Sequence, residues 1–217
     1  MTRGVANSDG APNVAEIKLL ESALQHFSDK GYAGTSIREI IESAGVTRPV
    51  LYYYFENKED LFRRLVEMKF AEYVGQVREV IRQVPGTRER LKAIMVSAFK
   101  MAEEQLQVVQ LILQVFFSPP AQGPPLDRNR LGRKRFKLIE EIMREGLDRN
   151  ELSGGDAQSL ALVFIGIMEM HIMAKSNRPD IQLTPELAEG LVDLFLNGAQ
   201  YTEAPASQLK SLYSATG

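Results

Sequence analysis

The sequence predicts an all-α protein with a small N-terminal head and a larger C-terminal body. Apolar residues recur every three or four positions along most of its 217 residues, which is the spacing of one face of a helix. No segment alternates strictly between apolar and polar residues around an Asn-Gly or Asp-Gly turn, so β-hairpins are not expected. Glycine and proline stand between the periodic segments and separate one predicted helix from the next.

The first two predicted helices end at glycines. Gly31, which suits the left-handed end of a helix, follows the first apolar stripe, and Gly45 follows the second. Thr35 or Ser36 is the expected N-cap of the second helix, and Glu39 stands where it can complete a Ser-x-x-Glu capping box. The two stripes consist of Ile17, Leu20, Leu24 and Phe27, and of Ile37, Ile40, Ile41 and Ala44.

A very short third helix is predicted from Thr47 to about Tyr54. Pro49 is tolerable in its first turn, where an N–H would have no partner within the helix. If Thr47 is the N-cap, its hydroxyl should accept from the N–H of Val50, because Pro49 offers none. Asn57 then caps a fourth helix.

The body is predicted to begin after Pro85-Gly86. We expect helices at about 88–117, 127–148 and 156–174, a loop at 118–126, and a last helix opened by Thr184 and Pro185. The predicted divisions are a disordered tail at 1–14, a helix-turn-helix DNA-binding domain at 15–67, a ligand-binding and dimerisation domain at 68–201 and a flexible tail at 202–217.

The third helix presents an unusual outer face. If Leu51 points inward, steps of about 100° per residue bring Phe55 within about 40° of it and place Pro49 and Tyr53 nearly opposite. This apolar and aromatic face carries few charges, whereas a face that only meets solvent would carry more charged side chains. The last two head helices and their Gly45 turn therefore read as a helix-turn-helix whose second helix enters the DNA major groove. The candidate DNA-binding residues are Thr35, Ser36, Thr47, Arg48, Pro49, Val50, Tyr52, Tyr53, Tyr54 and Lys58.

The segment from Thr35 to Glu67, "TSIREIIESAGVTRPVLYYYFENKEDLFRRLVE", resembles the signature of TetR-type transcriptional regulators. The resemblance covers about 50 residues, from Ala15 to Glu67, and departs at Tyr54, where the family often has histidine. It implies an all-helical homodimer, an inducer pocket in the body and, usually, repression relieved by a small ligand. The matching positions are Phe27, Gly31, Thr35, Ile40, Ala44, Gly45, Val46, Leu51, Tyr52, Phe55, Lys58 and Leu61.

Two surfaces of the body are candidates for binding. Aromatic and methionine side chains that could line a pocket, or form plain core, are Phe99, Met101, Leu113, Phe116, Phe117, Phe164, Met168 and His171. The last two helices are apolar on more than one face, so part of that surface is expected to form a twofold interface. The interface candidates are Leu160, Val163, Ile167, Leu191, Leu194 and Phe195.

Composition narrows the function. The chain has no cysteine, only two histidines and a net charge of -2, so no metal site and no cofactor are expected, and DNA contact must come from a local patch. The basic run 127–137 reads as a solvated helix face. The longest apolar stretch, Leu160–Ala174, is too short for a bilayer and contains Glu169. Together with what the TetR-type resemblance implies, these observations lead us to expect a cytoplasmic, ligand-responsive DNA-binding regulator. Its expected partners are double-stranded DNA, a second copy of the chain and a small apolar or amphipathic ligand.

Two alternatives remain open at this point. A small all-α enzyme would need a cluster of facing ionisable groups, and the body offers no Glu-x-x-His pair. A scaffold protein could use the short aromatic helix to dock another protein, and such binding would depend little on salt. The tyrosines could also cover the joint between head and body.

Overall fold

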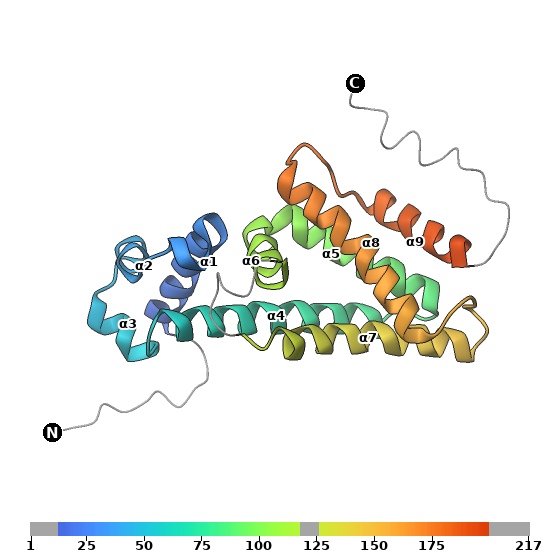
Figure 1. Ribbon diagram of the computed structural model, residues 1–217, viewed down its shortest axis with the longest axis horizontal. Coiled ribbons are helices and arrows are strands. Elements are labelled where there is room, and N and C mark those ends of the chain that lie inside the picture. Colours follow the sequence, from blue (N-terminus) through green and yellow to red (C-terminus); the bar gives the residue numbers. More distant parts are fainter. Residues whose placement is uncertain (1–12, 118–125, 200–217) are drawn as a thin grey trace. The chain divides into compact units, whose positions relative to one another are not determined.

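The computed structural model describes residues 13–117 and 126–199, and all regular structure in these residues is helical, as predicted (Figure 1). Most of the predicted tails and residues 118–125 of the predicted loop lie outside this range. The helices are α1 Val14–Gly34, α2 Ile37–Ala44, α3 Arg48–Tyr54, α4 Lys58–Arg82, α5 Thr87–Glu104, α6 Leu106–Phe117, α7 Arg128–Asp148, α8 Ala157–Asn177 and α9 Pro185–Ala199.

The chain divides into two compact units. Among the described residues, unit 1 comprises 13–73, 105–117 and 126–131, and unit 2 comprises 74–104 and 132–199. The division therefore falls within α4 and α7, and it groups α6 with the head helices instead of the body. The sequence boundary at residue 67 lies two turns earlier in α4.

Unit 1 is built on α1, which packs against α2, α3 and α6. Its inward residues Leu19 and Phe27 have no exposed surface, and Ile40, Leu51 and Leu61 complete the same core. Gly31 has φ +71° and interrupts α1, and helical structure resumes as far as Gly34. The left-handed glycine was predicted, but the helix does not stop there.

The first apolar stripe was assigned one position wrongly. Ile17 is exposed, and Leu19 takes the buried position at the start of α1. Leu19, Ala23 and Phe27 form a second series at i, i+4 spacing, and only the packing of α1 against its neighbours shows that this series is the buried one.

The predicted continuous helix from Arg88 to Phe117 is wrong, because it is divided at Gln105 into α5 and α6. The carbonyl of Gln105 accepts from the N–H groups of Val108 and Val109 and so begins α6. In unit 1, the Gln114 side chain of α6 donates to the carbonyl of Ser28 on α1 (2.8 Å). No glycine or proline marks the division.

Unit 2 is formed by α5, α8 and α9 with most of α7 and the end of α4. α5 packs against α8 and α9, and the fully buried Phe99, Phe164 and Met168 lie in this core. As predicted, Thr184 caps α9, because its hydroxyl accepts from the N–H of Leu187 (3.2 Å), and Pro185 is the first helical residue.

One buried cation organises the connection between α8 and α9. The Lys175 ammonium donates to the carbonyls of Pro179 (3.2 Å) and Ile181 (2.7 Å) and pairs with Glu103 of α5 (2.8 Å). Glu103 also accepts from the N–H of Leu183 (2.7 Å). These bonds hold its pKa below the ordinary value against the opposing effect of burial.

α8 is longer than the apolar stretch seen in the sequence. By length and composition alone it could cross a membrane. Within unit 2, however, Glu169 pairs with Arg135 and Lys175 pairs with Glu103, while Phe164 and Met168 are fully buried. These ion pairs and buried side chains show that one side of α8 packs within unit 2.

Candidate nucleic-acid interface

The start of α2 is fixed by the predicted capping box. The Ser36 hydroxyl accepts from the Glu39 N–H (3.2 Å), and the Glu39 carboxylate accepts from the Ser36 N–H (2.8 Å). Lys30 pairs with the same carboxylate (2.6 Å). The hydrogen bond from Lys30, followed by those from Ser36, lowers the pKa of Glu39 to about 2. α2 therefore begins at a defined residue, with the Ser36 side chain at the surface.

Thr35 has a different place from the one expected of a DNA-contacting side chain. The residue is only 2% exposed, and its hydroxyl lies within hydrogen-bond distance of the carbonyls of His26 (2.9 Å) and Gly31 (2.8 Å). It ties the interrupted end of α1 to the start of α2. A direct contact from this hydroxyl to DNA would require it to leave these partners.

The turn between α2 and α3 uses the predicted glycine. Gly45 is left-handed (φ +64°, ψ 34°), and its N–H donates to the carbonyl of Glu42 (3.3 Å). The next N–H, that of Val46, donates to the carbonyl of Ile41 (3.1 Å). This left-handed residue lets the chain reverse between the two helices within a short turn.

The expected cap by the Thr47 hydroxyl is wrong. α3 has no side-chain capping bond, and the Val50 N–H donates to the backbone carbonyl of Thr47 (3.1 Å). The Leu51 N–H donates to the same carbonyl (3.2 Å). Because the backbone closes the first turn by itself, the exposed Thr47 hydroxyl is left for an outside partner.

The two faces of α3 are those that the helical geometry predicts. Leu51 is fully buried and Phe55, just after the helix, is 1% exposed, whereas Tyr53 is 75% and Tyr52 45% exposed. Pro49 is also exposed. A seven-residue helix thus holds aromatic rings in solvent on one side by burying two apolar side chains on the other.

The exposed rings contact their neighbours. Tyr53 and Tyr54 meet edge to face with centroids 4.9 Å apart. The Arg48 guanidinium lies 5.6 Å from the Tyr52 ring centroid, and its Nη2 is 3.5 Å from the Tyr52 hydroxyl. The face therefore combines flat apolar surface with phenol hydroxyls and one guanidinium cation. The hydroxyls and the guanidinium can hydrogen-bond to polar groups of a partner.

Arg64, which sequence reasoning did not single out, anchors the end of α3. Its guanidinium donates to the carbonyl of Tyr54 (2.7 Å), pairs with Glu16 of α1 (2.7 Å) and stacks 4.7 Å from the Phe55 ring centroid. The carbonyls near a helix end lack intrahelical partners, so an arginine in the second turn of the next helix is a sequence signal for such a contact.

Lys58 is the first residue of α4, and Asn57 caps this helix as predicted by accepting from the Asp60 N–H (2.9 Å). The Lys58 ammonium lies 4.3 Å from the Tyr32 ring centroid. Partial burial lowers the pKa of Lys58. The lysine is thus positioned beside the N-terminal N–H groups of α4, where a phosphate could meet both.

The predicted pocket residues do not share one unit. Phe99, Met101, Phe164, Met168 and His171 belong to unit 2, and His171 lies beside Phe99 with ring centroids 6.1 Å apart. The remaining three, Leu113, Phe116 and Phe117, are on α6 in unit 1.

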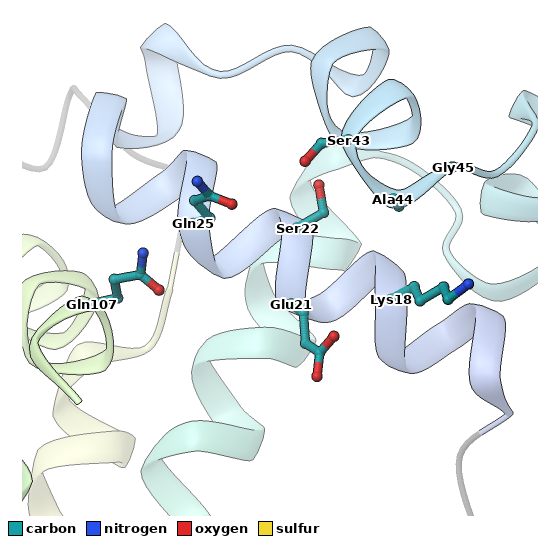
Figure 2. Close-up of a pocket in the computed structure, with 8 residues that line it drawn as sticks. All are labelled: Lys18, Glu21, Ser22, Gln25, Ser43, Ala44, Gly45 and Gln107. Carbon is teal, nitrogen blue, oxygen red and sulfur yellow. The ribbon is translucent and has the colours of Figure 1, made fainter. Parts of the chain in front are cut away.

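An open cleft on unit 1 is lined by none of the predicted pocket residues (Figure 2). Ser22 is buried at its floor and donates to the carbonyl of Ile40 (2.9 Å). The cleft is lined by Lys18, Glu21, Ser22 and Gln25 of α1, by Ser43, Ala44 and Gly45 at the end of α2, and by Gln107 of α6. These side chains are mostly polar and exposed, so the cleft does not resemble an apolar ligand site.

The residues predicted to form the subunit interface differ in exposure. Leu160, Leu191 and Phe195 are buried within the chain, and assigning them to a subunit interface needs correction. They were misplaced because apolar periodicity does not tell which face packs internally. Ile167 is half-buried, and Val163 and Leu194 are exposed. Val163 lies on one face of α8, whose exposed members are Leu162, Val163, Gly166 and Met170.

No group of three or more His, Asp or Glu side chains within the described residues is arranged to hold a metal ion.

The basic run 127–137, at the start of α7, is only partly a solvated face. Lys134 and Lys137 are exposed. Arg130, however, pairs with Glu67 in unit 1, and Arg135 pairs with Glu169 in unit 2.

Comparison with known proteins agrees with this geometry. Residues 19–65 match the family model described as bacterial regulatory proteins of the tetR family. The transcriptional activator FasR of Mycolicibacterium smegmatis is 33% identical over 97 residues, which are 45% of this chain and 44% of FasR. The transcriptional repressor KstR2 of Mycobacterium tuberculosis is 28% identical over 151 residues, or 66% of this chain and 74% of KstR2.

Solved structures share the fold across both units. FadR of Bacillus subtilis in complex with stearoyl-CoA superposes with a TM-score of 0.72 at 19% identity, covering 84% of this chain and 98% of FadR. AibR in complex with isovaleryl coenzyme A and operator DNA superposes with a TM-score of 0.68 at 22% identity, with coverages of 84% and 98%.

Proposed function

Because this chain belongs to the TetR family of helix-turn-helix transcriptional regulators, we propose that it acts as a homodimeric repressor released from its operator by an acyl-CoA. The proposal places it in the cytoplasm, beside the chromosome. The observation that carries the DNA-binding role is the exposed aromatic face of α3, set against the buried Leu51 and Phe55.

In this proposal α3 enters the major groove. Pro49, Val50 and the rings of Tyr52 and Tyr53 would contact thymine methyl groups and base edges. The free Thr47 hydroxyl, Ser36, Arg48, Tyr54 and Lys58 would contact phosphates and fix the register. Thr35 would act from inside, by holding the start of α2.

The proposed dimer uses the exposed apolar face of α8 and α9. Leu162, Gly166 and Met170 follow one another at i, i+4 spacing on α8, and Val163 lies two turns before Met170 on the same face. Leu194 is an exposed apolar side chain on α9. Gly166 lies in the middle of the α8 face with open space around it, so another helix can approach closely there. Twofold pairing would let two heads read major grooves about 34 to 36 Å apart on a pseudo-palindrome.

Two observations support an acyl-CoA as the effector: the ligands of solved relatives and the apolar interior of unit 2. Two solved relatives of the same fold hold acyl-CoA thioesters, and unit 2 has an apolar interior that includes Phe99, Phe164 and Met168. An acyl chain suits such an interior, and coenzyme A makes the molecule amphipathic. A ligand that binds the DNA-free conformation better would release the operator.

The first test is a selection on random duplex DNA, run with the wild-type protein and with Tyr53→Ala. Enrichment of a palindrome by the wild type alone would support a dimer that reads sequence through Tyr53. Binding that is insensitive to salt and without enrichment would instead favour the protein-docking scaffold, since phosphate contacts weaken steeply as salt rises.

The second test adds stearoyl-CoA or isovaleryl-CoA to the protein bound to the enriched duplex, with free coenzyme A as the control. Release by a thioester but not by coenzyme A is expected. Tighter DNA binding on ligand addition would contradict the release mechanism, and a reporter gene that is activated by the ligand-free protein would contradict repression.

The dimer is tested separately by Val163→Arg, which places a charge on the α8 face. Sedimentation should show a shift from dimer to monomer, while Lys100→Ala on exposed α5 surface leaves the dimer intact. A dimer that is unaffected by Val163→Arg and by Leu194→Arg would place the interface elsewhere.

A further inference from the structure

Arg135 occupies an unexpected position on α7. It lies one turn before Ile139, which is fully buried, on the same side of α7 as Ile142 and Met143. Its side chain is only 12% exposed. The sequence run to which it belongs reads as a solvated face, yet this arginine points its charge toward the interior of unit 2.

The guanidinium has one protein partner and an unused donor. Nη2 of Arg135 pairs with Oε1 of Glu169 on α8. Nε of Arg135 is buried and has no hydrogen-bond partner among the described residues. An arginine carries only donors, so Nε requires an acceptor, and a buried N–H without one is unfavourable.

The neighbouring surface of α8 is mainly apolar. Ile165 and Ile172, one turn to either side of Glu169 on the same face of α8, are both buried. His171 is already engaged, because its Nδ1 lies 2.7 Å from the carbonyl of Ile167. A few polar groups in an otherwise apolar interior are typical of sites that orient an amphipathic ligand.

We infer that Arg135, held in place by Glu169, recognises the thioester carbonyl oxygen of the effector and so distinguishes acyl thioesters from other molecules with the same alkyl chain. This inference rests on the proposed acyl-CoA function and names the part of the ligand that is read. The carbonyl oxygen accepts a hydrogen bond from the Nε–H of Arg135.

The charge of the pair favours a thioester over a free fatty acid. Arg135 and Glu169 together are neutral, and a carboxylate would add an uncompensated negative charge to a buried site. A thioester carbonyl is a neutral acceptor and adds none. The acyl chain would then lie along the apolar side chains of unit 2.

The decisive probe is the thioether analogue of stearoyl-CoA, in which a methylene group replaces the carbonyl. Calorimetry on the full-length wild-type protein should show stearoyl-CoA binding about tenfold or more tightly than the thioether, the usual scale of a lost hydrogen bond to a charged group. Stearate and octadecanol, with the same chain and other head groups, should bind more weakly than stearoyl-CoA.

The protein variant is the double substitution Arg135→Gln and Glu169→Gln, which removes both charges together and avoids leaving one buried alone. It should bind thioester and thioether with equal affinity. Lys134→Gln, an exposed neighbour on α7, is the matched control and should keep the preference. Arg135→Lys keeps the charge but lacks Nε, and should lose the preference while remaining folded.

The outcomes separate this inference from the proposed function. Equal binding of thioester and thioether by the wild type, with operator release intact, would overturn the role of Arg135 and leave the acyl-CoA effector standing. A preference retained in the double variant would also overturn it. Failure of the wild type to bind any acyl probe would reject both proposals.

Discussion

The head and the body expose apolar surface of different kinds. On α3 the exposed side chains are phenols next to an arginine, whereas on α8 they are aliphatic and flank a glycine. Phenol rings offer a polar tip as well as a flat face, so they suit a wet, charged partner such as DNA. Aliphatic side chains around a glycine suit a dry contact with another helix. The comparison teaches that exposed hydrophobicity is informative only together with the polar groups beside it.

The largest effects should come from removing the buried support behind each surface. Phe55→Ala in unit 1 and Phe164→Ala in unit 2 should each lower the free energy of unfolding by about 3–5 kcal/mol, the usual cost of a buried phenylalanine. Hydrogen exchange read by mass spectrometry should place the first loss in unit 1 and the second in unit 2. Equal deprotection of both units by either variant would show that they unfold as one.

The buried cation of unit 2 should have the next largest effect. Lys175→Met deprives two carbonyls and the Glu103 carboxylate of their donor and should lower the free energy of unfolding by about 1–3 kcal/mol. Urea denaturation measures this, with the exposed Lys134→Met as the control. Wild-type stability in Lys175→Met would mean that the α8–α9 connection does not depend on its ammonium.

Tyr53→Ala should separate binding from stability. The ring is largely exposed, so the free energy of unfolding should change by less than about 0.5 kcal/mol. Operator affinity, measured by fluorescence anisotropy, should fall by about tenfold or more if the ring contacts bases. A variant that unfolds more easily and binds normally would assign Tyr53 to packing instead.

The smallest effect concerns the charge at the start of α2. The pKa of Glu39 lies near 2 in the folded protein, below its ordinary value of 4.5, so its ionised form stabilises the fold above about pH 5. That contribution should decline as pH falls toward 2. Wild type should therefore exceed Glu39→Gln in thermal stability at pH 7 and lose the advantage in acid. A difference between the two proteins that stays constant from pH 7 into acid would contradict this role of Glu39.

Most helix ends of the head could be predicted because their signals are local. Three helix ends are specified by hydrogen bonds between residues that are close in sequence. They are the capping box of Ser36 and Glu39, the turn at Gly45 and the cap by Asn57. The donor and the acceptor of each bond can therefore be recognised in the sequence. The α3 faces followed from the helical repeat alone. The prediction of the Thr47 cap was wrong because the Val50 N–H bonds to the backbone carbonyl of Thr47 instead of its hydroxyl. Residue spacing does not distinguish these two acceptors.

The body could be predicted only as a series of helices. The division at Gln105 has no glycine or proline, and it follows from where α5 and α6 pack. Likewise, the burial of Leu160, Leu191 and Phe195 depends on neighbours that are distant in sequence. Arg135 was hidden for the same reason, because five other basic residues surround it in the sequence and only tertiary structure turns it inward.

α3 begins without a side-chain cap and is held by Leu51, Phe55 and the arginine that binds its last carbonyl. Its stability is therefore drawn from residues on the face opposite the proposed DNA contact. The outward positions, Pro49, Tyr52 and Tyr53, are free to vary with little consequence for folding. If α3 is the recognition helix, as proposed, such a division makes it evolvable, because new operator preferences can be explored by substitution on one face while the buried face keeps the fold. The same property makes these three positions suitable for libraries that redirect the protein to chosen DNA sequences.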